Sequence, residues 1–277
     1  MITFQCGECE GDAGVIAGDG MQSFGDAFIV HVRERHPDWP FPDVAIRNYA
    51  EATQRATGPT ERLDALGAVE IHPVTEDRIG DFLAFFDRDA FPDNFAWAAC
   101  YCTEPHLLDP AAPAATEGRT WQSNREHMAG RLKDGGSFGY LAYVDGAVGG
   151  WVNASKRSDY ALFREGAGRR SSAKDDLRGP SPSGGGPGAS PEDGDVVGIS
   201  CFVIGPPYRR HGLSRQLLER VVTDAAGRGV AWVEAYPFNE GVRGWGPDFR
   251  GARKMYDAMG FEPVDERERY TVVRRKA

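Results

Sequence analysis

The chain has 277 residues, enough for one large domain or for one domain with an appended module. Its 32 basic and 41 acidic residues give a net charge of −9, which argues against broad nucleic-acid binding and leaves room for a cationic small substrate. No apolar run approaches the roughly 18 residues needed to cross a bilayer, so no membrane partner is expected. Five cysteines, together with a polar and acidic amino terminus unlike a signal peptide, predict a cytoplasmic protein.

The first 40 residues carry a pattern of cysteines and histidines that is typical of zinc sites. Cys6 and Cys9 form a Cys-x2-Cys pair, and His31 and His36 form a His-x4-His pair on one predicted helix. A tight turn that supplies two thiolates and a helical face that supplies two imidazoles suit tetrahedral Zn²⁺. A segment this short seldom folds without such a staple. We therefore expect a zinc-finger-like Cys2His2 module over residues 1–40.

One feature of this segment keeps the alternative of unliganded thiols and surface histidines open. The spacer between Cys9 and His31 has 21 residues, more than the roughly 12–15 of typical fingers. The predicted helix also lacks a sustained basic stripe, so nucleic acid is not expected as a partner even if the metal is bound.

Residues 41–68 are predicted to form a helical linker. Asp43 can cap a helix that runs to Gly58-Pro59, where the chain must leave the helical conformation. Thr60 can cap one or two further helical turns.

From Val69 the apolar pattern becomes regular and predicts a mixed α/β domain over residues 69–277. A strand at the start of this region is followed by a helix that Thr75 caps, and later by a helix with a Ser123–Glu126 capping box. The sequence Asp145-Gly146 marks the turn of a β-hairpin over residues 137–155.

The composition changes sharply at residues 165–195, where Gly, Pro, Ser and charged residues predominate. This predicts a flexible insertion within the domain, and a lid that orders over substrate is the alternative. A nearly continuous apolar strand follows at 196–204, then a helix from Leu213 and a second apolar strand at 230–236. A helix through Tyr256 and two short strands complete the domain.

The turn between strand 196–204 and the helix at Leu213 combines positive charge with a bare backbone. The start of a helix presents unpaired N–H groups, which together with the helix dipole favour anions and phosphate above all. Gly212 lets an anion approach the backbone, Arg209 and Arg210 add charge, and Ser214 can donate a hydroxyl. The turn has neither the Gly-Lys-Ser/Thr of a Walker loop nor the three spaced glycines of a dinucleotide fingerprint.

The sequence of this turn, IGPPYRRHGLS, resembles the acetyl-CoA loop of the GNAT N-acetyltransferase superfamily. The family pattern is Val-x-Pro-x-Tyr-Arg-x-x-Gly-x-Gly/Ala. Ile204 lies at the valine position, and Pro206, Arg209 and Gly212 match their positions. Ser214 replaces the usual final Gly or Ala, which is a small change.

A second match follows at ARKMYDAMGF, which resembles the family's Ala-x-x-Leu-Tyr-x-x-x-Gly-Phe helix, with Tyr256 at the tyrosine and Gly260-Phe261 closing it. The family often has Asn three residues before this alanine, whereas this chain has Phe249, so the cofactor contact of that Asn would be missing. The order of elements from Val69 also follows the family, so the resemblance covers about three quarters of the chain.

The resemblance implies a GNAT-like fold, with a mixed, mostly antiparallel central sheet, splayed strands and flanking helices. It implies direct transfer of an acetyl group from acetyl-CoA to a primary amine. The pantetheine arm would lie between strands 196–204 and 230–236, and the pyrophosphate at the cationic turn. The expected cofactor-binding residues are Phe202, Val203, Ile204, Arg209, Arg210, His211, Gly212, Leu213 and Ser214.

The chemistry needs an acid for the departing thiolate and a base for the incoming ammonium. The resemblance gives Tyr256 the acid role, with an aromatic core residue as the alternative. Glu234, a lone carboxylate in an apolar strand, is the predicted base, because burial raises the pKa of a carboxyl group. The alternative for Glu234 is a carboxylate paired with an arginine. Asp159 and Tyr160 are candidate acceptor contacts, and the CYCTEPH segment (100–106) is expected to be packing.

Two other functions stay open on the sequence alone. A regulatory protein that binds acyl-CoA without turnover would keep the cationic turn, and an adaptor that uses its zinc module for protein or nucleic acid would keep the Cys2His2 pattern. The sequence does not identify the acceptor amine, and a homodimer would be ordinary for this family.

Overall fold

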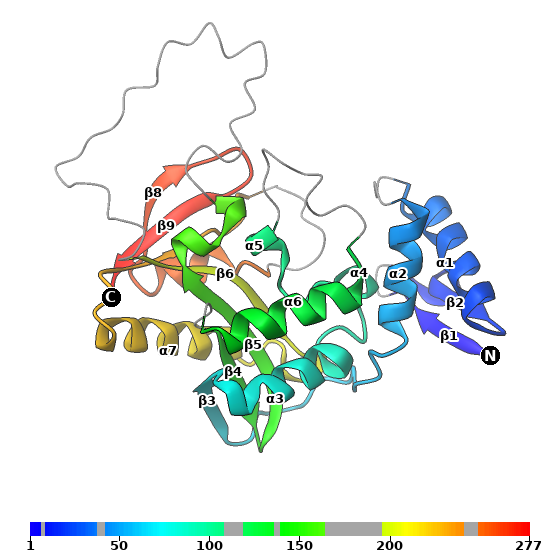
Figure 1. Cartoon of the computed structure of the whole chain (residues 1–277), viewed down its shortest axis with the longest axis horizontal. Coiled ribbons are helices and arrows are strands. Elements are labelled where there is room, and N and C mark those ends of the chain that lie inside the picture. The colour runs from blue at the N-terminus through cyan, green and yellow to red at the C-terminus, as the bar shows by residue number, and fades with distance from the viewer. Residues whose placement is uncertain (7–8, 38–41, 108–118, 136–138, 164–195, 241–248) are drawn as a thin grey trace, which may run out of the picture.

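The computed structural model describes residues 1–6, 9–37, 42–107, 119–135, 139–163, 196–240 and 249–277. A large α/β body carries a small module that contains the amino terminus, and the two chain termini lie at opposite ends of the molecule (Figure 1). The insertion expected at 165–195 lies outside the described residues. No helix in the part of the chain that is described is long and apolar enough to cross a membrane.

The amino-terminal module is a β-hairpin packed on a helix. Strands β1 (Ile2–Gln5) and β2 (Val15–Gly18) pair antiparallel, and α1 (Met21–Arg35) crosses them. Phe24 and Phe28 of α1 pack with Ile16 of β2 in a core of their own. The helix and the Cys2His2 pattern of this small ββα unit agree with the zinc-finger-like module predicted from the sequence; the hairpin is an addition by the structure.

The next helix, α2 (Asp43–Thr53), contributes to two cores. Ile46 and Ala50 pack in the core of the amino-terminal module, while Ala52 packs against the short helix α4 (Phe95–Ala98) and its neighbour Ala99. The domain boundaries predicted from the sequence stay predictions, but the packing joins α2 to the module as much as to the body.

The prediction of a second helix in the linker, capped by Thr60, is wrong. Residues 60–67 form no helix, and the helix expected to reach residue 58 ends at Thr53. The chain there is held by the cationic turn instead: the Leu63 N–H donates to the Pro207 carbonyl at 3.0 Å, and His211 Nε2 donates to the Leu63 carbonyl at 2.9 Å. Tertiary contacts therefore override the local helix signal.

The body is built on a seven-stranded sheet with the order β3-β4-β5-β6-β7-β9-β8. All neighbours are antiparallel except β6 and β7, which confirms the mixed, mostly antiparallel sheet. The strands are β3 (Val69–Pro73), β4 (Tyr140–Val144), β5 (Ala147–Lys156), β6 (Val196–Ile204), β7 (Trp232–Ala235), β8 (Glu262–Glu266) and β9 (Thr271–Lys276).

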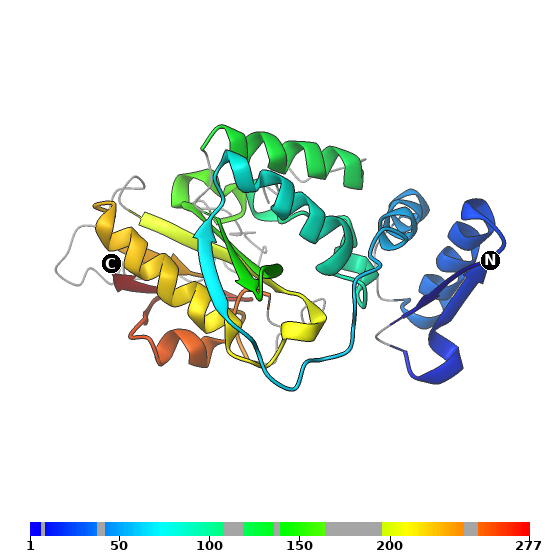
Figure 2. The ribbon, with the colours of Figure 1, turned by 90° about the horizontal axis from the view of Figure 1, so that it is seen from below.

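Helices cover both faces of this sheet (Figure 2). On one face lie α3 (Ile79–Ala84), which continues as a π-turn, and α6 (Trp121–Lys133), and their core includes Phe82 and Met128. On the other lie α7 (Leu213–Gly227) and the short α8 (Arg253–Asp257), whose core includes Leu217 and Tyr256. The alternation of side chains along the strands therefore fills two separate cores.

The capping box expected from Ser123 and Glu126 is one turn out of place. Helix α6 begins at Trp121, the Thr120 hydroxyl accepts the Ser123 N–H, and the Ser123 hydroxyl reaches back to the Thr120 main chain. Thr120 is the better N-cap because its hydroxyl precedes the helix, whereas Ser123 is already inside it.

The sheet opens between β6 and β7. These strands pair at only four positions, from Val196↔Trp232 to Ile199↔Ala235. Strand β6 continues beside β5 as far as the pair Gly150↔Ile204, so its second half, residues 200–204, has no strand partner on the β7 side among the described residues. This confirms the predicted splay and leaves main-chain groups of β6 free to pair with something else.

Candidate functional site

The cationic turn follows directly on the open end of β6. A 3₁₀ turn (Pro206–Tyr208) redirects the chain, and Arg210 and Gly212 both take left-handed φ values, +69° and +79°. Gly212 is the N-cap of α7, and a Cβ placed on it would meet nothing within 4 Å. Within the described structure, the main-chain N–H groups of residues 210–214 donate no hydrogen bond to another main-chain group. Successive free N–H groups at a helix start form a site for an anion.

The side chains of this turn divide into two sets. Arg209 holds the turn: its Nε donates to the Ile204 carbonyl at 2.9 Å and its Nη2 to Asp93 at 3.0 Å. His211 is occupied by its hydrogen bond to Leu63. Arg210 is exposed, and Ser214 is half-buried.

Leu213 differs from its neighbours, because its side chain is buried in the core under α7. Only its main-chain N–H can therefore face a ligand. Of the residues predicted to contact the pyrophosphate, Arg210 and Ser214 have side chains open to solvent, while Arg209 and His211 position the main chain.

The open half of β6 is contacted by a later segment of the chain. The Phe202 N–H donates to the Phe249 carbonyl at 2.5 Å. The next carbonyl, of Arg250, accepts the hydroxyl of Tyr256 at 2.6 Å. Gly251 follows at φ +82°, and a Cβ there would lie 2.8 Å from the Tyr256 hydroxyl oxygen. The segment 249–251 thus runs beside β6 where the resemblance places the pantetheine arm.

Tyr256 is fully buried between this segment and the core of α8. Burial raises the pKa of its phenol well above the usual value, so the hydroxyl keeps its proton at neutral pH. A buried, protonated phenol beside the open strand can donate a proton to a leaving group. The position suits the predicted acid, and the packing with Phe261 also serves the core.

Glu234 is 3% exposed and is held on all sides. Its carboxylate accepts hydrogen bonds from Nη2 of Arg274 at 2.6 Å and from the hydroxyl of Tyr236 at 2.8 Å. The guanidinium of Arg157 lies 3.6 Å away. These contacts match the paired carboxylate that the sequence leaves as the alternative. A role for Glu234 as the base stays a prediction.

A second carboxylate, Glu104, was missed by the sequence reasoning. It begins α5 (Glu104–Leu107), and its side chain reaches the surface, although protein packs closely enough around the carboxyl group to desolvate it. Desolvation by the surrounding protein raises the pKa of Glu104, and the charges of Arg250 and Arg269 oppose that rise. The available signal was the CYCTEPH segment, which contains Glu104 but was interpreted as packing alone.

Helix α5 is fixed against β5 by His106. Its Nδ1 bonds the Asp159 carbonyl and its Nε2 bonds Asn153 Nδ2, both at 3.1 Å. Burial lowers the pKa of His106 to about 4, so the imidazole is neutral. Asn153 lies opposite Cys201 of β6, which brings the start of α5 near the open half of that strand.

The two predicted acceptor contacts have structural partners. The Tyr160 hydroxyl is buried and donates to the Gly198 carbonyl at 3.0 Å. The Asp159 carboxylate lies 3.7 Å from Arg131. Their role in binding an acceptor stays a prediction.

The amino-terminal module brings together the four predicted metal ligands. The ligand atoms of Cys6, Cys9, His31 and His36 all lie within 4.8 Å of one another. Cys6 Sγ is 3.4 Å from His36 Nε2, and Cys9 Sγ is 3.5 Å and 3.7 Å from His36 and His31 Nε2. The five-residue step between the histidines works because α1 ends at Arg35, so that His36 leaves the helix and turns back.

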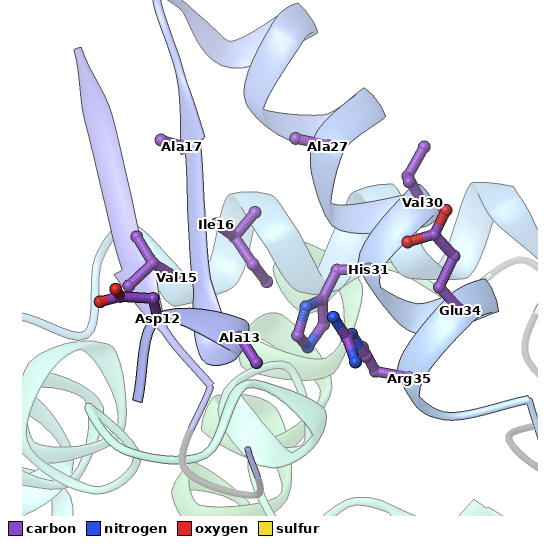
Figure 3. Close-up of a pocket in the computed structure, with 10 residues that line it drawn as sticks. All are labelled: Asp12, Ala13, Val15, Ile16, Ala17, Ala27, Val30, His31, Glu34 and Arg35. Atoms are coloured by element: carbon purple, nitrogen blue, oxygen red, sulfur yellow. The ribbon is translucent and has the colours of Figure 1, made fainter. Parts of the chain in front are cut away.

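A surface hollow of about 360 Å³ lies on the same module, between β2 and α1 (Figure 3). Ile16 and Ala27 form part of its wall, and His31 lies at its edge. No residue of the cationic turn lines this hollow. It is therefore separate from the site at the cationic turn.

Comparison with known proteins gives the family to which this fold belongs. The model of the acetyltransferase (GNAT) family matches residues 104–261, more than half of the chain. The chain belongs to the GNAT family and is an N-acetyltransferase by that membership. No curated protein matches it.

Three solved structures have a similar course of the chain at low sequence identity. An N-acetyltransferase from Staphylococcus aureus Mu50 has 12% identity and a TM-score of 0.41, covering 76% of this chain and 99% of that one. The GNAT domain of S. lividans PAT has 13% identity and a TM-score of 0.43, covering 76% and 92%. The PaiA N-acetyltransferase from Thermoplasma acidophilum, in complex with coenzyme A, has 9% identity and a TM-score of 0.40, covering 76% and 99%.

Proposed function

We propose that the chain uses acetyl-CoA to acetylate a primary amine by direct transfer. The observation that carries this proposal is the continuity of three features: the open half of β6, the free N–H groups of residues 210–214, and the buried hydroxyl of Tyr256. One end of this path suits a pyrophosphate, and the other suits a thioester. Acetyl-CoA would supply the activated acetyl group.

The residues of the turn would hold the pyrophosphate. The N–H groups of Gly212, Leu213 and Ser214 and the α7 dipole favour the anion, and the exposed Arg210 can add a charge-assisted hydrogen bond. Arg209 would act through the turn rather than on the phosphate, because Asp93 and the Ile204 carbonyl already occupy its donors.

The nitrogen loses two protons in the reaction, and the thiolate gains one. As the amine nitrogen attacks the acetyl carbon, the carbon–sulfur bond breaks and the thiolate takes a proton, for which Tyr256 is the donor. The proton that the nitrogen loses as the amide forms restores the Tyr256 phenol. The incoming ammonium must first lose a proton, and Glu234 and Glu104 are the two candidate acceptors. The carboxyl group of Glu104 carries the raised pKa and its side chain reaches the surface, whereas Glu234 is enclosed by arginines, so we favour Glu104.

The test is a calorimetric titration of acetyl-CoA into the protein and two glutamate variants. Gly212→Glu would abolish micromolar binding, because the carboxylate would repel the pyrophosphate at the free N–H groups. Gly229→Glu is the matched control: it too has a positive φ and nothing within 4 Å of a Cβ, but it lies just after α7 ends. Absence of binding to the unaltered protein, or equal loss in both variants, would remove the proposal.

We also propose that Cys6, Cys9, His31 and His36 bind a structural Zn²⁺. Zn–S bonds near 2.3 Å and Zn–N bonds near 2.0–2.1 Å at a tetrahedral angle put sulfur and nitrogen about 3.5 Å apart. The three sulfur–nitrogen distances of 3.4, 3.5 and 3.7 Å fit that value. Such a metal would hold the hairpin to α1. The chain is acidic, so the module is better suited to packing against protein than to binding nucleic acid.

None of the five cysteines, all of which lie in the described part of the chain, forms a disulfide, which is consistent with a cytoplasmic location. The rival function, an acyl-CoA-binding regulator without turnover, would share the cofactor affinity but show no acetylation of any amine. An acceptor screen at saturating acetyl-CoA separates the two.

A further inference from the structure

A buried arginine on the segment beside β6 lies among aromatic rings. Arg250 is 7% exposed, and its guanidinium carbon is 4.3 Å from the ring centre of Phe238, 5.1 Å from that of Phe163 and 5.3 Å from that of Tyr270. We call these three rings the cation cage. They come from three separate segments: the turn after β5, the chain beyond β7 and the residue before β9.

The guanidinium is poorly paired for a buried charge. Its Nε and Nη1 have no hydrogen-bond partner among the described residues. Burial lowers the pKa of Arg250, and the nearby charge of Glu104 opposes that fall. The attraction available to Arg250 therefore comes largely from the faces of aromatic rings, which suit other organic cations as well as this side chain.

The main-chain carbonyls of Phe249 and Arg250 accept hydrogen bonds from two donors that the proposed reaction requires. The Phe249 carbonyl takes the N–H of Phe202, and the Arg250 carbonyl takes the hydroxyl of Tyr256. A pantetheine arm paired with β6 and a thiolate protonated by Tyr256 would need the same two donors. Acetyl-CoA and the segment 249–251 therefore compete for one place, and displacing the segment would take Arg250 out of the cation cage.

We propose that the cation cage is the subsite for a cationic group of the acceptor, an organic ammonium or guanidinium, and that Arg250 fills it when no ligand is bound. This inference rests on the proposed acetyl transfer, since the acceptor is defined by it. The acceptor then carries a second positive charge beside the amine that is acetylated. The net charge of −9 favours approach of such a molecule.

The test asks whether the cage binds a free cation once Arg250 is removed. Methylguanidinium, methylammonium and the uncharged isostere methylurea are titrated calorimetrically into Arg250→Ala without acetyl-CoA. We expect saturable binding of one or both cations, at least about tenfold weaker binding in the unaltered protein, and no binding of methylurea. The two cation arms tell guanidinium from ammonium.

Two further variants locate the binding. Phe238→Ala in the Arg250→Ala background should weaken cation binding at least about tenfold, because it removes the nearest ring. Arg267→Ala is the control, since its guanidinium carbon lies farther out, 5.9 Å from the Tyr270 ring, and should create no cation site. No saturable cation binding, equal binding of methylurea, or no loss on Phe238→Ala would overturn the proposal.

If circular dichroism shows that Arg250→Ala does not fold, the unaltered protein and Phe238→Leu are compared instead. The ratio of kcat/KM for a diamine to that for the amino alcohol of equal length should fall about tenfold in Phe238→Leu. An unchanged ratio would overturn the proposal. The calorimetric arm needs no acetyl-CoA. Absence of acetyl-CoA binding to the unaltered protein would therefore remove the proposed function and leave cation binding to be judged separately.

Discussion

At the scale of single residues, Tyr256 combines complete burial with a hydrogen bond that a reacting thiolate could replace. Its hydroxyl donates to the Arg250 carbonyl, and burial holds the pKa of the phenol well above its usual value. The group therefore stays protonated across the neutral range, as an acid must. A basic limb in the pH–rate profile near neutrality would have to come from another group.

Tyr256→Phe should lower kcat by at least about tenfold, since general acid catalysis contributes roughly 10²–10⁴-fold in enzymes. The KM for acetyl-CoA should change little, because the binding groups at the turn are untouched. Unfolding free energy should fall by about 1 kcal/mol from the lost hydrogen bond. Steady-state kinetics and thermal unfolding measure these separately, and an unchanged kcat would return Tyr256 to a purely structural role.

Glu104 is the residue whose ionisation should control the acid side of the pH profile. Desolvation raises the pKa of its carboxyl above the ordinary 4.5, so the base form is lost as the pH falls through that raised value. Glu104→Gln should reduce kcat/KM at neutral pH and abolish the acid limb of its pH profile. Glu126→Gln, an exposed glutamate on α6, is the control and should leave the profile unchanged.

At the scale of elements, Glu234 and Arg274 face each other across β7 and β9 and clamp these strands together. Glu234→Gln would leave Arg274 and Arg157 in a buried place without a counter-charge. The expected loss is about 3–5 kcal/mol of unfolding free energy. Chemical denaturation measures this; a large fall in kcat at unchanged stability would instead make Glu234 the base.

The elements that could be predicted from the sequence are those whose signal is local. Strand β6 reads as an apolar run because both faces are buried, and the hairpin turn follows from Asp145-Gly146, both at positive φ. The start of α7 at Gly212 likewise follows from turn residues. The family motif added the splay of β6 from β7.

The elements that could not be predicted depend on contacts distant in sequence. Nothing in the sequence near Thr60 indicates that the Leu63 N–H will donate to the Pro207 carbonyl, or that residues 60–67 will form no helix as a result. In the same way, no periodicity shows that the Phe249 carbonyl will reach Phe202, or that Arg250 will lie among three rings. Glu104 was missed because its role depends on the desolvation around it, which the sequence does not display.

At the scale of the whole molecule, the amino-terminal module should contain one zinc ion per chain. Elemental analysis of the purified protein measures it, and Cys9→Ser should reduce the content to near zero because a thiolate ligand is lost. Cys100→Ser, which changes a thiol outside the four-residue cluster, is the control and should retain the metal. Metal-free protein with an unaltered thermal transition would contradict the proposal.

The module is also tied to the body by polar contacts of α2. The Trp121 N–H donates to Asn48 at 2.9 Å, and Arg55, just after the helix, donates to the Tyr101 hydroxyl at 2.8 Å and pairs with Asp87. Arg55 also lies 3.7 Å over the ring of Trp121. These contacts come from the middle of α2 and from just beyond its carboxyl end, and they add to its apolar packing on α4.

Helix α2 belongs to two cores. If either the amino-terminal module or the body unfolds with α2, the other therefore loses the packing of that helix. A ligand that binds only the folded form stabilises the whole unit that unfolds cooperatively with its site. An ion held at one end of the chain would therefore set the melting temperature of the enzyme at the other end. The lifetime of the acetyltransferase in a cell would then follow the supply of metal.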